Sequence, residues 1–157
     1  MESIQLKKDN ILRIGIKEAD GTDTGNVLEF DLEDIELPIR LQECFEEHKK
    51  NVQTLKGQYI IIDKKPDKKG KKLMSANEEA KIKAMQEFYK KEIEALDLFL
   101  GQGGTEKLLN GRKPYFTMFD DINEYLEPIV PLIKERAGSI EDKIKAKYAK
   151  KESDVLE

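Results

Sequence analysis

The segment from Ile93 to Phe116 reads IEALDLFLGQGGTEKLLNGRKPYF and carries the clearest signals of how the chain folds. Its first part predicts the end of a long helix, because apolar residues recur there at intervals of three or four and so line one helical face. These residues are Ile93, Leu96, Phe99 and Leu100. Gly101 stands where helices commonly end in a left-handed residue, and Gly103 and Gly104 predict a flexible turn. We call residues 101–104 the glycine corner and expect the chain to reverse there.

A short helix is predicted directly after the glycine corner. Thr105 can cap it by accepting a backbone N–H, the helix covers about residues 105–110, and Gly111 closes it. Pro114 suits the first turn of the next predicted helix, about 115–133. The apolar residues on both sides of the corner are the expected centre of the core. They are Phe99, Leu108, Leu109, Tyr115, Phe116 and Phe119.

Composition limits the class of protein. The chain has 157 residues, of which 38% are hydrophobic and 38% are charged, and its net charge is −4. The charged fraction exceeds the roughly 25% of an average globular protein, so the helices must carry charge on their outer faces. A negative net charge gives no overall attraction to nucleic acid. The single cysteine excludes an internal disulfide, and the absence of a long apolar run or an apolar signal core favours a cytosolic protein without a membrane span.

The first part of the chain, about residues 11–32, predicts a β-hairpin. Apolar and polar residues alternate on both of its strands, which is typical of a half-buried sheet. Ile4 and Leu6 could add a short third strand. The turn loosely follows the spacing of a calcium loop, with candidate positions Asp20, Thr22, Thr24, Gly25, Val27 and Asp31. Because threonine replaces two acidic ligands and strands flank the turn, a solvated hairpin loop is the preferred interpretation.

Two long helices are predicted next, at about residues 37–62 and 76–100. Residues 59–62 could instead form a short buried strand, since so short an apolar run does not distinguish the two. His48 and Cys44 lie on the apolar face of the first helix, and no cluster of metal-binding residues surrounds them, so packing roles are expected. The second helix opens with a possible capping box, Ser75 to Glu78. Its polar face is expected to carry Glu87, Lys90, Lys91, Glu92 and Glu94.

A lysine-rich loop connects the two long helices. Six lysines lie within residues 64–72, which we call the lysine loop, and a proline and a glycine oppose any packed element there. One interpretation is an electrostatic patch for nucleic acid or an acidic protein. The preferred one is a mobile, solvated loop, because no aromatic or arginine contacts are interleaved.

The C-terminal part predicts a weakly anchored helix. Pro128 and Pro131 should bend or restart the helix at 115–133. We expect one globular domain at 1–137, followed by a short helix and tail at 138–157 that opens at Ser139. Its apolar anchors recur every four residues and share a face, which suits docking on another chain. The predicted partner-binding residues are Ile140, Ile144 and Tyr148.

Catalytic chemistry is not evident in the sequence. It contains no nucleophile elbow, phosphate loop or metal-ligand spacing. The glycine corner resembles a phosphate loop only superficially, because it follows a helix and lacks the lysine–serine ending. Asp120, Asp121 and Glu124 share a helical face, as carboxylates of solvated helices often do. We therefore expect no catalytic residues, no cofactor and no metal, and a fold of the α+β class that is predominantly α-helical: a hairpin packed on three main helices, with a short C-terminal helix.

The order of elements, together with the motif Leu96-Asp-Leu-Phe-Leu-Gly-Gln-Gly103 and the following Lys107-Leu-Leu-Asn-Gly111, resembles the tail assembly chaperones of long-tailed (siphovirus-like) bacteriophages. The resemblance covers about residues 10–135. Leucine stands here where many members have a second aromatic before the first glycine, and Gln102 stands where many have glutamate.

The resemblance implies a non-enzymatic function. Such chaperones coat the tape measure protein in the host cytoplasm, help to recruit tail tube subunits and are not retained in the virion. The resemblance also implies a homo-oligomer, whereas the negative net charge and the lack of a long apolar run are the reasons to expect contact with neither nucleic acid nor a membrane. The alternative is a small nucleic-acid-associated phage or plasmid protein that uses the lysine loop, whose binding would fall steeply with salt.

Overall fold

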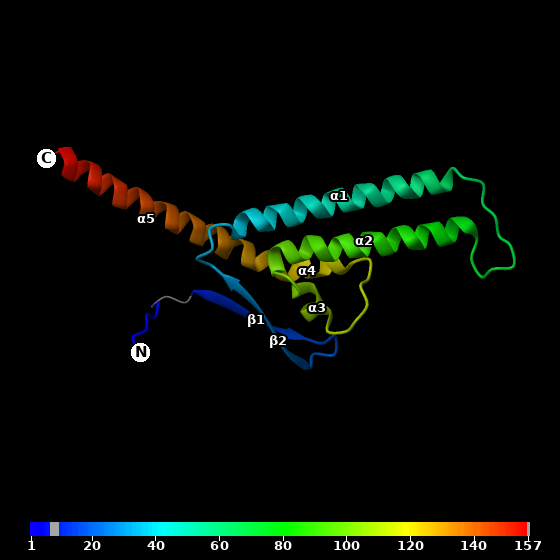
Figure 1. The fold of residues 1–157 in the computed structure, drawn as a ribbon, viewed down its shortest axis with the longest axis horizontal. Helices are drawn as coiled ribbons and strands as arrows, with labels where there is room; N and C mark the ends of the chain where they lie inside the picture. Colours follow the sequence, from blue (N-terminus) through cyan, green and yellow to red (C-terminus); the bar gives the residue numbers. More distant parts are fainter. Residues whose placement is uncertain (7–9, 157) are drawn as a thin grey trace. The chain divides into compact units, whose positions relative to one another are not determined.

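The computed structural model describes residues 1–6 and 10–156, and the side chains of these as far as Ala149. It confirms the predicted class, because the chain is 62% helical and has a two-stranded antiparallel hairpin followed by helices (Figure 1). The chain forms two compact units. We call them the hairpin unit, Met1–Ile39 with Ile122–Glu157, and the helical unit, Arg40–Asp121.

The hairpin unit begins with strands β1 (Ile11–Lys17) and β2 (Asp23–Asp31), which pair antiparallel with an irregularity between Gly15 and Lys17. Alternation along the strands turns one face inward, as the sequence predicts. The residues buried on this face are Ile16, Leu28 and Phe30. The predicted third strand is wrong, because Ile4 and Leu6 are 95% and 87% exposed and residues 1–6 form no strand.

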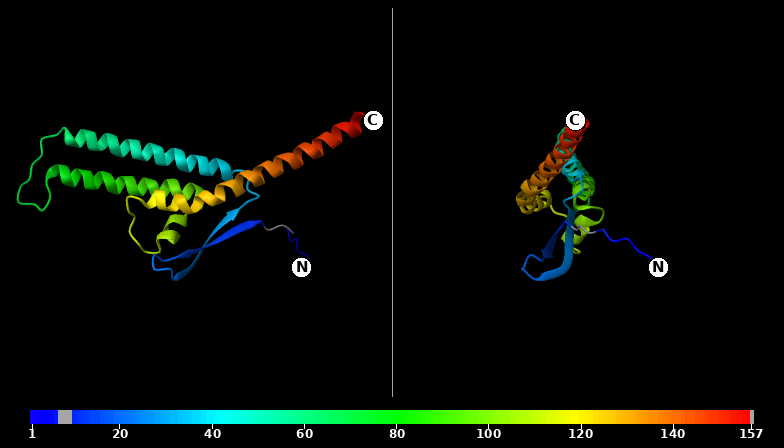
Figure 2. Two further views of the ribbon diagram at one scale, coloured as in Figure 1. Left: turned by 180° about the vertical axis from the view of Figure 1, so that it is seen from behind. Right: turned by 90° about the vertical axis from the view of Figure 1, so that its left-hand side faces the viewer.

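Two long antiparallel helices, α1 (Leu37–Asp63) and α2 (Ala76–Leu100), dominate the helical unit and lie side by side in both views (Figures 1 and 2). Residues 59–62 are helical, so the strand alternative is excluded. Apolar residues at helical spacing face inward on both helices. The buried set is Leu41, Cys44, Leu55, Ile62, Phe88, Ala95, Leu96, Phe99 and Leu100. The short α3 (Gly104–Leu109) follows the glycine corner.

The predicted helix at 115–133 is three elements in the structure. Helix α4 (Met118–Leu126) is followed by a 3-10 turn, η1 (Glu127–Ile129), and by α5 (Val130–Leu156). Pro128 lies within η1, which accounts for the interruption because proline lacks the N–H that an α-helix needs there. Pro131 lies in the first turn of α5, where the missing N–H costs nothing.

The prediction that Ser139 opens a new helix is also wrong. Helix α5 is continuous through it, so the predicted boundary between residues 137 and 138 falls inside a helix. The side chains of residues 150–157, part of the predicted tail, lie outside the described residues. Within the hairpin unit, the guanidinium of Arg136 on α5 pairs with Glu33, which also accepts a hydrogen bond from the amide of Asn10 at 3.4 Å. These contacts tie α5 to the segment that follows β2.

Candidate functional site

The glycine corner is held by a carboxylate. Asp97, one turn before the end of α2, accepts hydrogen bonds from the backbone N–H of Gly103 at 3.2 Å and from that of Thr105 at 2.9 Å. The hydroxyl of Thr105 donates to the same carboxylate at 2.7 Å. One side chain therefore satisfies N–H groups that the start of α3 would otherwise leave without acceptors. The corner is a hydrogen-bonded turn, not the flexible one that its glycines predict.

The glycines of the corner have separate roles. Gly101 and Gly103 have φ values of 88° and 79°, which side-chain-bearing residues rarely adopt. Gly104 lies inside α3, where an added Cβ would come within 2.5 Å of the Cβ of Leu100. Its function is close packing of α3 on α2. The prediction that Thr105 caps α3 is wrong, because Thr105 lies inside the helix and Gly103 occupies the N-cap position.

The predicted core around the corner is partly correct. Leu96 is 1%, Phe99 4% and Phe119 5% exposed. Phe116, however, is 63% exposed, because it precedes α4 and Met118 takes the buried place at the start of that helix. The ring of Phe116 lies 6.4 Å from that of Phe88.

A buried polar cluster lies between α1 and α2. Glu92 is only 2% exposed, so its predicted place on the polar face of α2 is wrong. Its Oε2 lies 2.6 Å from Nδ1 of His48, and its Oε1 accepts a hydrogen bond from Asn51 at 2.8 Å. The His48 ring stacks on Phe119, with centroids 3.6 Å apart and planes 5° from parallel. Both carboxylate oxygens of Glu92 therefore have partners, as a buried carboxylate requires.

Few features of the sequence indicate this cluster. His48 and Asn51 lie one turn apart on the inner face of α1, but Glu92 sits among charged neighbours, and only the pairing of the two helices shows that it points inward. A histidine next to a carboxylate can act as a base when a nucleophile lies within reach. The thiol of Cys44 is not such a nucleophile. Burial and the charge of Glu92 raise its pKa to about 12, so it stays protonated at neutral pH. The hydrogen bonds of the cluster join α1 to α2, which is a structural role.

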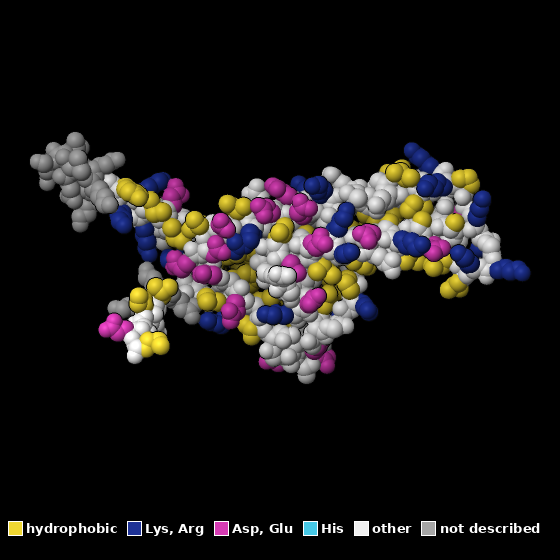
Figure 3. All heavy atoms as spheres, in the orientation of Figure 1, with side chains coloured by type: hydrophobic (Ala, Val, Ile, Leu, Met, Phe, Trp, Pro, Cys, Tyr) yellow, Lys and Arg dark blue, Asp and Glu magenta, His cyan; other side chains and the backbone are white. Residues whose placement is uncertain are grey.

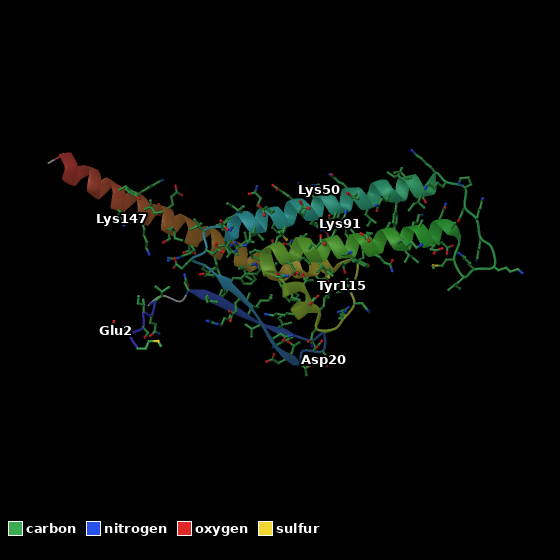
Figure 4. All side chains as sticks on the ribbon, viewed as in Figure 1. Glu2, Asp20, Lys50, Lys91, Tyr115 and Lys147 are labelled. Carbon is green, nitrogen blue, oxygen red and sulfur yellow. The ribbon has the colours of Figure 1, made fainter. Side chains whose placement is uncertain are left out.

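A groove runs alongside this cluster on the surface of the helical unit. Its floor includes Asn51 and Ala95, and its walls carry charges of both signs, among them Lys50 of α1 and Lys91 of α2, which are labelled in Figure 4. The remaining lining residues are Glu43, Glu47, Thr54, Glu94 and Leu98. Such a mixture of charges does not select an ion of one sign.

The lysine loop is exposed but anchored at its end. The N–H of Ala76 donates to the carbonyl of Lys68 at 2.8 Å, and the N–H of Asn77 donates to the Asp67 carboxylate at 3.1 Å. The Asn77 N–H and the Ser75 hydroxyl lower the pKa of Asp67. Ser75 is buried and caps α2 by accepting the N–H of Glu78 at 3.1 Å, as predicted. The nearby Asp63 pairs with Lys81, and no ion pair to a described side chain is found for the six loop lysines.

The predicted partner-binding residues share a stripe on α5. Ile144 and Tyr148 are 50% and 58% exposed, whereas Ile140 is half-buried. Leu132, two turns before Ile140, is 44% exposed. Figure 3 shows hydrophobic side chains along this helix between charged ones.

The hairpin turn is stabilised by its own side chains. The Asp20 carboxylate accepts the N–H and the hydroxyl of Thr22, which lower its pKa, and Asp23 accepts the N–H of Gly25 at 2.9 Å. These hydrogen bonds order the turn through one oxygen of each carboxylate. No group of three or more histidine, cysteine or acidic side chains among the described residues could hold a metal ion.

None of the helices in the described part of the chain combines the length and the apolar character needed to cross a bilayer. Comparison of the chain with protein-family models, with curated proteins and with solved structures finds no match.

Proposed function

We propose that the protein is a non-enzymatic phage tail assembly chaperone that binds the tape measure protein and helps to recruit tail tube subunits. The observation that carries the proposal is the partly apolar, exposed face of α5. The resemblance of the segment around the glycine corner to such chaperones supplies the identity of the partner.

The geometry of α5 suits a helical partner. Its 27 residues extend for roughly 40 Å at about 1.5 Å per residue. Ile140, Ile144 and Tyr148 recur at every fourth position, so they form a continuous stripe that another amphipathic helix can contact. A tape measure protein offers many such helical segments in one chain.

The modest size of this stripe fits the function. A chaperone must cover its partner and later leave, and three apolar side chains provide only weak contact for each copy. Many copies along one tape measure protein would bind by avidity. The high surface charge would keep the assembly in solution in the host cytoplasm. The chaperone is then released and is not retained in the virion.

The test uses purified full-length protein and fragments of a tape measure protein. The double variant Ile144→Ser/Tyr148→Ser should weaken binding about tenfold or more, because it removes most of the exposed apolar area of the stripe. Leu73→Ser is the matched control, since Leu73 is 91% exposed in the helical unit and should leave binding unchanged. Equal binding by the double variant and the wild type would refute the role of α5, and a wild type that binds no fragment would refute the proposed function.

The second candidate is nucleic-acid binding through the lysine loop. The observation in its favour is that no described carboxylate pairs with the six lysines. Binding of this kind would weaken linearly with the logarithm of the salt concentration. Replacing all six lysines by serine would abolish it without changing binding to the tape measure fragments.

A further inference from the structure

The end of the helical unit at which α1 meets α2 collects positive charge. Residues 56–83, which we call the basic tip, contain nine lysines and four acidic residues, so their net charge is +5. The whole chain carries −4, so the residues outside the basic tip carry −9. Figure 3 shows basic side chains gathered around this end of the two helices. The negative net charge of the chain therefore conceals a strongly basic surface.

Contacts between the two helices hold the basic tip together. The hydroxyl of Tyr59 on α1 donates a hydrogen bond to the backbone carbonyl of Lys81 on α2 at 3.5 Å. The ammonium nitrogen of Lys81 lies 5.5 Å from the centre of the Tyr59 ring and 2.5 Å from a carboxylate oxygen of Asp63. The last turns of α1 are thereby joined to the first turns of α2, and Figure 1 shows the lysine loop extending beyond both helix ends.

The acidic groups of the basic tip are largely engaged within the chain. Asp63 pairs with Lys81, and Glu79 pairs with Lys83 at 3.3 Å. The carboxylate of Asp67 accepts a backbone N–H of α2 at 3.1 Å. The six lysines of the lysine loop, by contrast, form no ion pair with a described side chain. Their charge is therefore available to an anionic partner.

Aliphatic side chains are exposed among these lysines. Leu73 directly follows Lys71 and Lys72 and is 91% exposed. Three isoleucines in the adjoining turns of α1 and α2 are exposed as well, namely Ile60, Ile61 and Ile82. Large aliphatic side chains that gather on a charged surface indicate an interaction site, whereas single ones are common on any protein. The basic tip therefore offers apolar contacts together with positive charge.

The combination of lysines and aliphatic residues selects the kind of partner. A nucleic acid would pair with the lysines but leave the aliphatic side chains in water, and residues 60–74 contain none of the aromatic or arginine side chains that stack on bases. A peptide is usually bound in a groove or at a sheet edge, and the groove of the helical unit includes no residue of the basic tip. An anionic lipid bilayer offers phosphate groups for the lysines and acyl chains for the aliphatic residues.

We propose that the basic tip docks on the surface of a membrane that contains anionic phospholipids. The six loop lysines contact the lipid phosphates, and Leu73 inserts among the outer parts of the acyl chains. The same surface repels the acidic remainder of the chain, so contact is confined to the tip. Docking of this kind needs no helix that crosses the bilayer. It is a property of the helical unit that adds to the proposed chaperone function and does not depend on it.

The first experiment measures co-sedimentation of the full-length chain with lipid vesicles. The chain should bind vesicles of phosphatidylcholine and phosphatidylserine, mixed at about three to one, and not vesicles of phosphatidylcholine alone, and salt should weaken the binding. The double variant Lys71→Ser/Lys72→Ser should bind about tenfold more weakly or worse, because each lysine near an anionic surface adds to the attraction. Lys143→Ser/Lys147→Ser is the control, since it removes two exposed lysines outside the tip and should leave binding nearly unchanged.

The second experiment tests insertion of the aliphatic side chain. Leu73→Ser keeps every charge of the basic tip, so weaker binding to the mixed vesicles, by about fivefold to tenfold, would reflect lost apolar contact alone. Ile35→Ser is the matched control, because Ile35 is 72% exposed but lies outside the tip, and its binding should equal that of the wild type. Both residues are exposed, so neither substitution should unfold the chain.

Three results would overturn the proposal. The first is a wild type that does not bind the mixed vesicles at low salt, and the second is a Leu73→Ser variant that binds them as well as the wild type. The third is a wild type that binds a DNA or RNA oligonucleotide more tightly than the mixed vesicles at the same salt concentration, which would assign the tip to nucleic acid. No tape measure protein is present in these experiments, so their failure would leave the proposed function standing.

Discussion

The two ends of α2 use the same chemistry with different results. At its N-terminal end the Asp67 carboxylate accepts the backbone N–H of Asn77, and at its C-terminal end the Asp97 carboxylate accepts those of Gly103 and Thr105. Thr105 is fully buried, whereas Asp67 stands in an exposed loop of lysines. A carboxylate that orders a turn therefore contributes to the fold when the turn packs on apolar residues. In an exposed loop it mainly orders the backbone locally.

The largest effect is expected from Phe99→Ala near the C-terminal end. Phe99 is 4% exposed, and truncating a buried phenylalanine lowers the free energy of unfolding by about 3–5 kcal/mol. Phe116→Ala is the control, because Phe116 is 63% exposed and the same truncation should cost far less. Denaturant unfolding of both variants measures the difference, and equal losses would show that the core is elsewhere.

Glu92→Ala should follow, with a loss of about 2–4 kcal/mol. The change leaves the buried amide of Asn51 without its acceptor and removes the partner of His48. Glu87→Ala on the exposed face of the same helix should lie within about 0.5 kcal/mol of the wild type. If the two variants unfold at the same denaturant concentration, the buried cluster does not stabilise the helix pair.

Gly104→Ala should cost about 1–3 kcal/mol, because the new methyl group would overlap the Cβ of Leu100. Gly70→Ala tests the other connection, since an added Cβ there has no atom within 4 Å and the φ of Gly70 is not in the left-handed region. Thermal unfolding should show a lower melting temperature for the first variant alone. A Gly104→Ala protein as stable as the wild type would mean that α3 can move away from α2 freely.

Asp97→Asn should cost about 1–2 kcal/mol, because the amide group replaces charged acceptor oxygens that serve two N–H groups and a hydroxyl. Asp67→Asn is the matched change at the exposed end and should have a smaller effect. The pKa of Asp67 is lowered from 3.8, so its contribution is present near neutral pH and is lost as the pH falls through the lowered value. Unfolding of both variants at neutral pH compares the two substitutions, and the difference between Asp67→Asn and the wild type should shrink at acidic pH.

The smallest effect is expected from replacing all six lysines of the lysine loop by serine. Their side chains are exposed and pair with no described carboxylate, so the melting temperature should stay within a few degrees of the wild type. A large decrease would show that these lysines stabilise the fold through contacts beyond the backbone bonds of Lys65 and Lys68.

The spacing of apolar residues and the start and stop signals of helices and turns predicted most of the fold. The strands, both long helices, the Ser75 cap and the interruption near Pro128 follow from local rules that involve neighbouring residues only. The errors arise where contacts between residues far apart in the sequence determine the structure. Glu92 is buried because His48 and Asn51 approach it from another helix, and the corner is rigid because Asp97 reaches across it.

The C-terminal helix shows a different limit. Ser139 followed by acidic residues is a typical helix start, yet Ser139 lies inside α5. No residue before it ends the helix, because Gly138 has no positive φ and no proline follows Pro131. A start signal predicts a boundary only where the preceding turn also carries a stop signal. Ile140, Ile144 and Tyr148 all lie within α5, and their role in binding a partner stays a prediction.

Because Cys44 is buried, its reaction with a thiol reagent can report on the opening of the helix pair. The thiol is 2% exposed, its pKa is raised to about 12, and it is the only one in the chain. A thiol-specific reagent can modify it only when α1 and α2 separate or the chain unfolds. The rate of modification in native buffer therefore measures how often the helix pair opens. The same burial leaves any cysteine introduced on the surface as the single fast-reacting site for a spectroscopic label.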